Sequence, residues 1–351
     1  MFVSYKYVAK GITVMNRNTL RWIITAIIAL ALAFALSCPY IAGAEGILPS
    51  DYKEGGKPTK ADGWVFENKL PVSYEDSTIR VTFEKLEVTH TLTGPNQGKK
   101  VKDEAWVVRI KIKDPSQLRA AVSKDTYEGK HQSDAAAIAT SKNAVVAMNG
   151  DFFKYENDVG YVVRHGELIR DATSNPRRVF DMLLIDSEGD FHAVYSASTE
   201  SIEAFVAENL TPVGRTIMHT YNIGPVLVVN GEAQDVSKSE MARQGQYQWN
   251  YSIQRIALVQ TGPLEYAIVE NGIKSKTSGF SMQEFAEFVA EQCPDAILAY
   301  NLDGGGSTNL TAPCRIRTKK DGTVLIENER INRNNDLRDI TDIIYFASAE
   351  D

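Results

Sequence analysis

The chain contains little histidine and little cysteine, with 5 His and 3 Cys among 351 residues. The histidines lack the short spacings of zinc-binding motifs, so a zinc site is not expected; they stand at positions 90, 131, 165, 192 and 219. Two cysteines, Cys293 and Cys314, follow the N-terminal segment. The sequence leaves open whether they form a disulfide.

Basic residues are outnumbered by acidic ones. The chain has 38 Lys and Arg against 45 Asp and Glu, a net charge of −7, and residues 45–351 alone carry −11 because four basic and no acidic residues precede them. An acidic body argues against binding a polyanion through a broad basic surface. We therefore expect no nucleic-acid partner, although one or two arginines can still hold a phosphate locally.

An apolar run from Trp22 to Leu36 follows four basic residues and precedes Ala42-Gly43-Ala44. This pattern predicts a secretory signal peptide over residues 1–44, cleaved after Ala44. The alternative is an uncleaved signal anchor that contacts the membrane through residues 22–43, and a lipoprotein site at Cys38 fits less well. In each case we expect an extracellular or cell-envelope location.

The remainder reads as one domain. Residues 45–75 are polar and rich in Gly and Lys, which predicts a linker or loosely packed arm. From residue 76 to residue 349, period-two runs alternate with Gly and Asn turns, which is typical of strands and hairpins. The composition, 43% hydrophobic and 24% charged, suits a sizeable core. We predict an α+β fold with mixed or antiparallel sheets and a few packed helices.

Three or four helices are expected, of which three have clear sequence signals. Residues 114–124 predict a short helix capped by Asp114 with Pro115 at its first position. Residues 133–142 predict a second helix, followed by the buried strand of "AVVAM". Residues 281–293 predict an amphipathic helix whose capping box pairs Ser281 with Glu284.

Two polar loops follow buried strands. "YNLDGGGSTNL" places Asp303 at a strand exit, followed by glycines whose amides are free to cradle an anion; "AMNGDFF" places Asn149, Gly150 and Asp151 at another. A tight turn and an Asx turn explain these loops equally well. If both strand ends face one cleft, the two carboxylates suit acid–base work on a glycosidic bond or the binding of a hard cation such as calcium.

The glycine loop matches none of three common templates. It lacks the final Gly of a nucleophile elbow and the Lys of a Walker loop. Counted from Asp303, the twelfth residue of an EF-hand loop is Cys314 rather than Glu. No cofactor is therefore assigned with certainty, and the metal stays unknown.

Two more features point to a ligand. Gly224, before Pro225 at the start of an apolar strand, would bring main chain near a ligand; simple punctuation of the strand is the alternative. Arg255 lies in an apolar strand, where a buried guanidinium needs an anionic partner such as Asp303, Asp151 or a substrate phosphate; an edge position facing water is the alternative. Arg164 is a weaker candidate because a hairpin arginine is usually solvated.

Taken together and in this order, "AMNGDFF", "IGPVLVVNGE", an Arg-led strand and "AYNLDGGGSTNL" resemble the phosphodiester glycosidase family over about residues 80–348. The resemblance implies hydrolysis of a sugar-1-phosphodiester, such as a GlcNAc-1-phosphodiester. It implies Asp303, Asp151 and Arg255 as catalytic residues. The substrate-binding residues it implies are Asn149, Gly150, Gly224, Gly304, Gly305, Gly306 and Ser307. Ile256 and Val259 depart from the family's usual residues beside Arg255.

The sequence thus predicts an exported glycosidase acting on a phosphoglycan of a cell wall or extracellular polysaccharide. Two alternatives remain: a carbohydrate-binding or wall-binding protein without turnover, and an exopolysaccharide-assembly protein anchored by residues 22–43. The changes at Ile256 and Val259 favour the former, and the retained Asp151, Asp303 and glycines oppose it. The roles of Asp151 and Asp303 are not separable at this level.

Overall fold

The computed structural model describes residues 46–94, 97–127, 131–151, 160–173, 180–243, 247–272, 279–322, 324–332 and 338–351. Glu45–Asp351 forms one compact unit. The segment predicted as a signal peptide or signal anchor, residues 1–44, lies outside the described residues. Within the described ranges, no helix is both long enough and apolar enough to cross a membrane.

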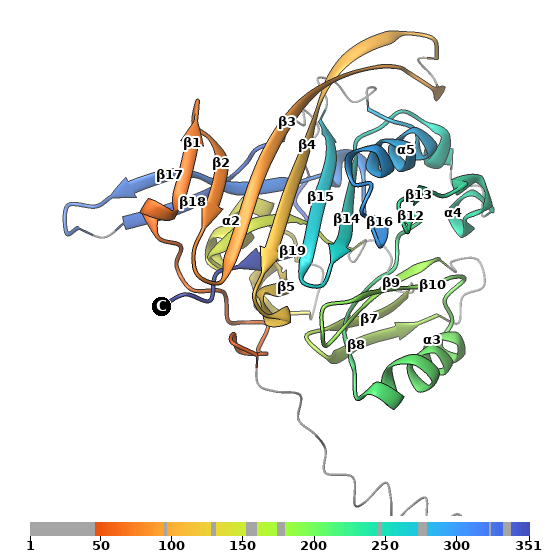
Figure 1. Ribbon diagram of the computed structural model, residues 1–351, viewed down its shortest axis with the longest axis horizontal. Coiled ribbons are helices and arrows are strands. Elements are labelled where there is room, and N and C mark those ends of the chain that lie inside the picture. Colours follow the sequence, from red (N-terminus) through yellow and green to blue (C-terminus); the bar gives the residue numbers. More distant parts are fainter. Residues whose placement is uncertain are drawn as a thin grey trace, which may run out of the picture. The chain divides into compact units, whose positions relative to one another are not determined.

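Three sheets form the framework, and every strand pair in the described part of the chain is antiparallel (Figure 1). The largest sheet has nine strands. Their spatial order is β1 (Trp64–Glu67), β2 (Leu70–Glu75), β3 (Ile79–Thr91), β4 (Lys100–Ile112), β15 (Glu265–Gly272), β14 (Arg255–Gly262), β16 (Leu298–Asn301), β12 (Val226–Val229) and β13 (Glu232–Ala233).

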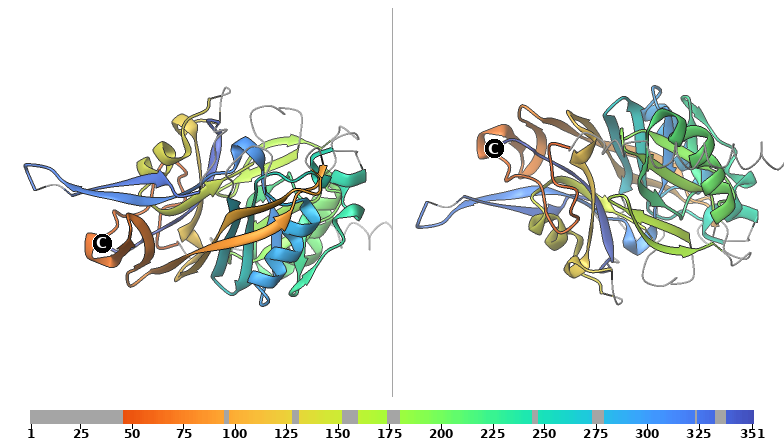
Figure 2. Two further views of the ribbon diagram at one scale, coloured as in Figure 1. Left: turned by 90° about the horizontal axis from the view of Figure 1, so that it is seen from above. Right: turned by 90° about the horizontal axis from the view of Figure 1, so that it is seen from below.

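The other two sheets have five strands each. One is ordered β10 (Phe191–Val194), β9 (Met182–Asp186), β11 (Ile217–Tyr221), β7 (Gly160–Arg164) and β8 (Glu167–Ala172). The other is ordered β18 (Val324–Arg330), β17 (Leu310–Thr318), β6 (Ala144–Asn149), β19 (Asp342–Ala347) and β5 (Leu118–Val122). The β17–β18 hairpin extends away from the rest of its sheet (Figure 2).

The helices are few and short. They are α2 (Ala135–Ser141), α3 (Thr199–Phe205), α4 (Glu240–Arg243) and α5 (Met282–Gln292), with single helical turns between strands. The capping box predicted for α5 is present: the Ser281 amide donates to the Glu284 carboxylate over 2.8 Å, and the Glu284 amide donates to the Ser281 hydroxyl over 3.4 Å. The mostly β, α+β architecture agrees with the predicted fold class.

The helix predicted over residues 114–124 is wrong. Asp114 and Pro115 begin a single 3₁₀ turn, as the capping pattern requires, but the chain then enters β5 (Leu118–Val122). Every residue of β5 is buried, and the strand pairs with β19. Tertiary pairing therefore overrides the helix propensity of Leu, Arg and Ala.

The core lies on both faces of the large sheet, which explains why its central strands are apolar throughout. On β14, Ile256 and Leu258 face the core shared with the other sheets, and Ala257 and Val259 face α5. Helix α5 covers that second face through an apolar stripe that includes Phe285. The side of β14 to which a residue points thus decides whether it approaches the other two sheets.

The loose arm predicted for residues 45–75 is wrong for residues 64–75. Trp64 and Tyr74, 6% and 0% exposed, pack with tilted rings whose centroids are 4.6 Å apart, in a hairpin that pairs with β3. The turn consists of Asn68 and Lys69, both with positive φ, the conformation of a tight type I′ hairpin. The sequence did not predict this turn, because its second position holds Lys69 instead of the glycine that is usual there.

Trp64→Ala is expected to lower the free energy of unfolding by about 3–5 kcal/mol, because it removes a buried ring from a packed core. Val65 is its neighbour on β1 and is 54% exposed. Val65→Ala, the matched control, is expected to change stability by less than about 0.5 kcal/mol. Urea unfolding of both variants measures the difference, and equal small effects would show that β1 does not pack on the core.

Candidate active site

The candidate site forms where the three sheets meet. β6 ends at Asn149 beside the start of β19, so that Gly150 lies against Asp342. A Cβ atom on Gly150 would lie 2.6 Å from the Asp342 carboxylate, which explains why only glycine fits there. Asp151, the next residue, is thereby brought to the Asp342 side chain, and its amide donates to that carboxylate over 2.9 Å.

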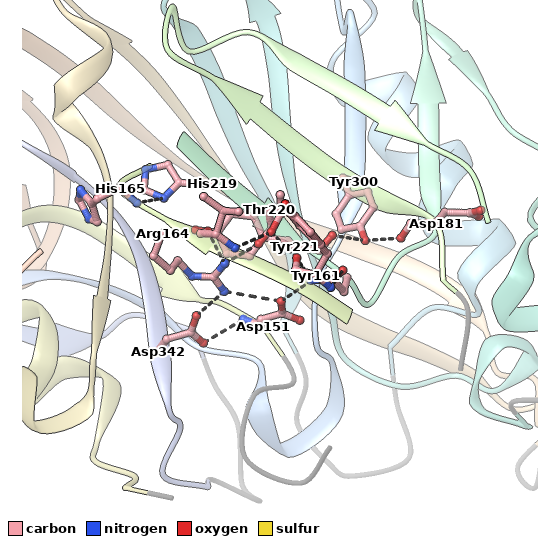
Figure 3. Close-up of polar contacts among 12 residues, drawn as sticks. Asp151, Tyr161, Arg164, His165, Asp181, His219, Thr220, Tyr221, Tyr300 and Asp342 are labelled. Atoms are coloured by element: carbon pink, nitrogen blue, oxygen red, sulfur yellow. Dashed lines mark hydrogen bonds and ion pairs between the residues drawn. The ribbon is translucent and has the colours of Figure 1, made fainter. Parts of the chain in front are cut away.

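Arg164, at the end of β7, binds both carboxylates (Figure 3). Its guanidinium lies 2.9 Å from Asp342 Oδ2 and 3.5 Å from Asp151 Oδ2. The three side chains are 0%, 2% and 5% exposed, in the order Arg164, Asp342, Asp151. Arg164 also stacks over the Tyr221 ring at 4.3 Å. We call Arg164, Asp151 and Asp342 the arginine cluster.

Burial and neighbouring charges together set the protonation of Arg164 and Asp342. Burial alone acts to lower the pKa of Arg164, but the electrostatic effects of Tyr221, Asp342 and Asp151 outweigh it and keep that pKa above its ordinary value. Burial also raises the pKa of Asp342 to about 6, and the Arg164 charge partly offsets this rise. The arginine therefore stays charged while Asp342 takes up a proton in mild acid.

Asn222, directly after β11, orients Asp151. Its amide nitrogen donates to Asp151 Oδ2 over 3.2 Å and to the Tyr161 carbonyl over 3.0 Å. Its carbonyl oxygen accepts from the Tyr161 amide over 3.0 Å, so the Asn222 side chain has a fixed orientation. Asp151 is thus held by groups from two sheets, a degree of preorganisation typical of functional carboxylates.

Asp303, after β16, is the second carboxylate. Asn149 donates to the Asp303 carbonyl over 2.8 Å, and its own carbonyl accepts from the Asn309 amide over 3.0 Å. Burial raises the pKa of Asp303 to about 6, against the lowering effect of a hydrogen bond from Ser307. The Asp151 charge also raises this pKa. The charge of Asp151 at one strand end therefore reaches Asp303 at the other.

The glycine loop has a structural explanation different from the predicted anion cradle. A Cβ on Gly304 would lie 2.6 Å from the Gln254 carbonyl, and Gly305 has φ of +61°. The Gly305 amide donates to the Gln254 carbonyl over 2.9 Å, while the Gly306 carbonyl accepts from the Arg338 amide over 3.1 Å. The glycines thus let the loop pass close to β14, and the Gly305 amide is already used.

Gly224 lies close to β16, where the Tyr300 hydroxyl oxygen is 3.6 Å from the position that a Cβ atom on Gly224 would take. Its carbonyl accepts from the Asn301 side chain over 2.6 Å, and its peptide bond with Pro225 is cis. The Tyr300 hydroxyl donates to the carbonyl of Tyr221 over 2.8 Å and to the carbonyl of Asp181 over 2.7 Å (Figure 3). Gly224 therefore fixes main chain between β11 and β16.

Arg255 is buried in an apolar strand, as the sequence indicated, but its partners differ from those expected. Its guanidinium donates to the carbonyls of Phe280 and Tyr251, each over 3.0 Å, and the charge that acts on it is that of Glu284. It shares a face of β14 with Ala257 and Val259, the face covered by α5. The predicted pairing of Arg255 with Asp303 or Asp151 is wrong, because strand alternation turns its side chain away from them.

Sequence reasoning ranked Arg164 too low and did not select three other residues of the site. The three are Asn222, Arg338 and Asp342. Arg164 in "VVRHGE" and Asp342 in "ITDIIYF" are single charges within apolar strands, a signal that buried ion pairs produce. Arg338 is exposed, and its charge lowers the pKa of Asp303. It is the arginine that accompanies Asp303.

Among the described residues, no group of three or more His, Cys, Asp or Glu side chains is arranged to hold a metal ion. Asp151 and Asp342 instead share the charge of Arg164. Cys293 and Cys314 are free thiols rather than a disulfide.

Comparison with known proteins places this site in a family. The family model described as phosphodiester glycosidase matches residues 142–347, which include the arginine cluster and Asp303. A zebrafish N-acetylglucosamine-1-phosphodiester α-N-acetylglucosaminidase catalytic domain, auto-inhibited by its pro-peptide, aligns with TM-score 0.54 and 14% identity over 88% of this chain and 99% of that chain. No curated protein sequence matches the chain.

Two further solved structures align less well. A hypothetical protein from Synechocystis has TM-score 0.44 and 15% identity over 76% of this chain and 62% of that chain. A putative exported protein from Burkholderia pseudomallei has TM-score 0.44 and 14% identity over 73% of this chain and 76% of that chain.

Asp342 makes stability depend on pH. Its pKa is about 6 in the folded chain and about 3.9 when unfolded, so the folded state binds more protons between these values. The free energy of unfolding therefore falls as pH rises through this window. Relative to Asp342→Asn, the wild type is expected to lose about 2 kcal/mol between pH 4 and pH 7.

Urea unfolding at several pH values measures this difference. Asp62→Asn, at an exposed position, is the control and is expected to follow the wild type at each pH. A constant stability difference between wild type and Asp342→Asn across the window would contradict the assignment.

Proposed function

Because this chain belongs to the phosphodiester glycosidase family, we propose that it hydrolyses the bond between the anomeric carbon of a sugar and a phosphodiester. N-acetylglucosamine is the first sugar to test, since it is the one named for the zebrafish protein of similar fold. The export pattern of residues 1–44 supports a substrate in a cell-wall polymer or an extracellular polysaccharide.

The observation that carries this proposal is the pair of carboxylates with different surroundings. Asp151 is held beside the permanent charge of Arg164, whereas burial raises the pKa of Asp303 to about 6. Carboxylates set apart by their surroundings are the usual equipment for glycoside hydrolysis. A binding protein has no need to shift the pKa of one of them.

The two carboxylates have distinct proposed roles. Asp303 accepts a proton from the attacking water, whose oxygen bonds to the anomeric carbon. The bond from that carbon to the phosphate oxygen breaks, its electron pair stays on the oxygen, and a phosphomonoester leaves. Asp151 stabilises the positive charge that develops on the sugar ring. Phosphate is a good leaving group, so the proposal assigns no general acid to it.

We assign to Arg338 the phosphate-binding role that the sequence had suggested for Arg255. Its side chain is exposed, its charge reaches Asp303, and its amide is tied to the Gly306 carbonyl. An accessible guanidinium beside the catalytic carboxylate is able to bind the substrate phosphate through two hydrogen bonds. Arg255 is buried and bound to carbonyls, so it is not available for this contact.

A carbohydrate-binding protein without turnover is the second candidate. The observation that favoured it is the departure from the family pattern at Ile256 and Val259. Both side chains are fully buried in apolar clusters on opposite faces of β14. None of the polar contacts of the arginine cluster or Asp303 uses these side chains, so the departures give little support to a loss of activity.

Asp303→Asn and Asp151→Asn are each expected to reduce kcat about 10³-fold, because each removes a carboxylate from the chemical step. Release of sugar from a GlcNAc-1-phosphodiester by residues 45–351 measures the effect. In the wild type, kcat/KM is expected to rise as pH increases through about 6, since Asp303 accepts a proton only when ionised. A chelator in a parallel assay tests the prediction of a divalent cation such as calcium.

The control for these variants is Asp62→Asn, which lies outside the site. Folded Asp303→Asn and Asp151→Asn proteins with unchanged kcat would contradict the proposed roles. Absence of turnover by the wild type, with retained binding of the same diester, would favour the binding protein instead.

Arg338→Ala is expected to raise KM about tenfold or more while changing kcat less, because the charged hydrogen bonds to phosphate are lost in the bound substrate. Arg80→Ala removes an exposed arginine from β3 and is the matched control. Steady-state kinetics of both variants provide the test. A KM for Arg338→Ala equal to that of Arg80→Ala would exclude Arg338 from phosphate binding.

A further inference from the structure

Glu270, on β15, is a carboxylic acid buried in an apolar core. Its side chain is 0% exposed. Within the large sheet it pairs with Trp106 of β4 on one side and with Ile256 of β14 on the other, and side chains at paired positions lie on the same face of a sheet. Both neighbours belong to the core that the large sheet shares with the other sheets. The Glu270 carboxyl therefore points toward those sheets.

These surroundings keep the Glu270 carboxyl protonated. Burial raises its pKa well above the ordinary value, a hydrogen bond from Asn332 opposes this, and the charges of Glu104 and Asp103 raise the pKa further. Oε1 accepts from Asn332 Nδ2 over 3.1 Å. Oε2 is buried without a hydrogen-bond partner among the described residues. An unpaired buried oxygen costs stability, so the contact with Asn332 is the feature of Glu270 that needs an explanation.

Asn332, which follows β18, links Glu270 to the chain beyond the glycine loop. Its Nδ2 also donates to the Thr308 carbonyl over 3.2 Å, and its Oδ1 accepts from the Leu310 amide over 2.9 Å. One side chain thus binds main chain on both sides of Asn309. Because Glu270 accepts the remaining N–H of the same amide group, it fixes the orientation in which Asn332 makes these two contacts.

Asn309 connects this bridge to Asp303 by two routes. Its amide donates to Asn149 Oδ1 over 3.0 Å and its carbonyl accepts from the Asn149 amide over 3.2 Å. The Asn149 side chain in turn donates to the Asp303 carbonyl over 2.8 Å. On the second route, the Asn309 side chain donates to the Ser307 carbonyl over 2.8 Å, and the Ser307 side chain is hydrogen-bonded to the Asp303 carboxyl. Hydrogen bonds therefore run without a break from Glu270 to Asp303.

We propose that Glu270 is a positioning residue for Asp303: its Oε1 orients Asn332, which holds residues 308–310 and through them the loop that carries Asp303. A general base must stay within hydrogen-bond reach of the water that it activates, so a small displacement of this loop slows the reaction. The inference rests on the proposed function for the role of Asp303. The hydrogen bonds that connect the two acids do not depend on it.

Amide hydrogen exchange, followed by NMR on residues 45–351, tests these contacts without a substrate. Glu270→Leu removes the acceptor and keeps an apolar side chain, so the Leu310 and Asn309 amides are expected to exchange about tenfold faster. Glu270→Gln keeps a neutral Oε1 acceptor and is expected to match the wild type. Glu84→Leu, at an exposed glutamate of β3 in the same sheet, is the matched control. Amides of β9, in another sheet, are expected to keep their rates.

A double-mutant cycle tests whether Glu270 acts through Asn332. Asn332→Ala alone is expected to speed exchange of the Leu310 amide at least as much as Glu270→Leu does. Adding Glu270→Leu to Asn332→Ala is expected to cause little further change, because the contact between the two side chains is already lost. Fully additive effects would show that Glu270 does not act through Asn332 and would overturn the proposal.

The kinetic readout separates positioning from a merely structural role. Glu270→Leu is expected to lower kcat about tenfold with little change in KM, and Glu270→Gln is expected to retain the wild-type kcat. Burial is the largest cause of the raised pKa of Asp303, which is about 6. Since a looser loop admits water, the midpoint of the pH profile of kcat/KM is expected to fall by about half a unit in Glu270→Leu.

Unchanged exchange of the Leu310 and Asn309 amides in folded Glu270→Leu would overturn the proposal. Faster exchange that extends equally to β9 would indicate a general loss of stability, and faster local exchange with unchanged kcat would indicate a merely structural contact; either result also overturns it. If Glu270→Leu does not fold, Glu270→Met, whose flexible side chain fits irregular space, takes its place. If the wild type does not hydrolyse the diester, the proposed function fails, whereas the exchange result still decides whether Glu270 holds the loop.

Discussion

The site depends on one buried interaction, the binding of two carboxylates by Arg164. β7 supplies the arginine, β19 supplies Asp342, and the end of β6 supplies Asp151. Leaving any of these charges alone in the interior carries a large desolvation penalty. The two five-stranded sheets are therefore constrained to meet where the three side chains do, and Gly150 has no side chain because Asp342 occupies that space.

The meeting of the sheets also gives different surroundings to Asp151 and Asp303, the two proposed catalytic carboxylates. Asp151 lies against a permanent cation and an oriented amide, whereas Asp303 is governed mainly by burial and a hydroxyl. Their side chains reach the site from different sheets, and Asn149 ties the two loops together through the Asp303 carbonyl. Such an arrangement places one carboxylate beside a cation and leaves the other able to exchange a proton near neutral pH.

Motif residues were predictable because strand ends and glycine loops are local patterns. Asn149, Asp151 and Asp303 do share one site, and the capping box of α5 is where Ser281 and Glu284 placed it. Arg255 and Arg164 show the limit. Both are single arginines in apolar strands, and the sequence favoured the wrong one because it does not reveal which face of a strand is covered by a helix and which meets another sheet.

The sequence by itself determined the strand-rich class, the family and the two carboxylate loops, since these follow from periodicity and from contiguous motifs. Only the tertiary structure decided that Arg164 holds Asp151, that Arg255 faces α5, and that the β1–β2 hairpin packs on the core. The physical reason is that an ion pair or an aromatic contact joins residues distant in the chain. The strength of such contacts depends on burial, which is a property of the assembled sheets and not of any one segment.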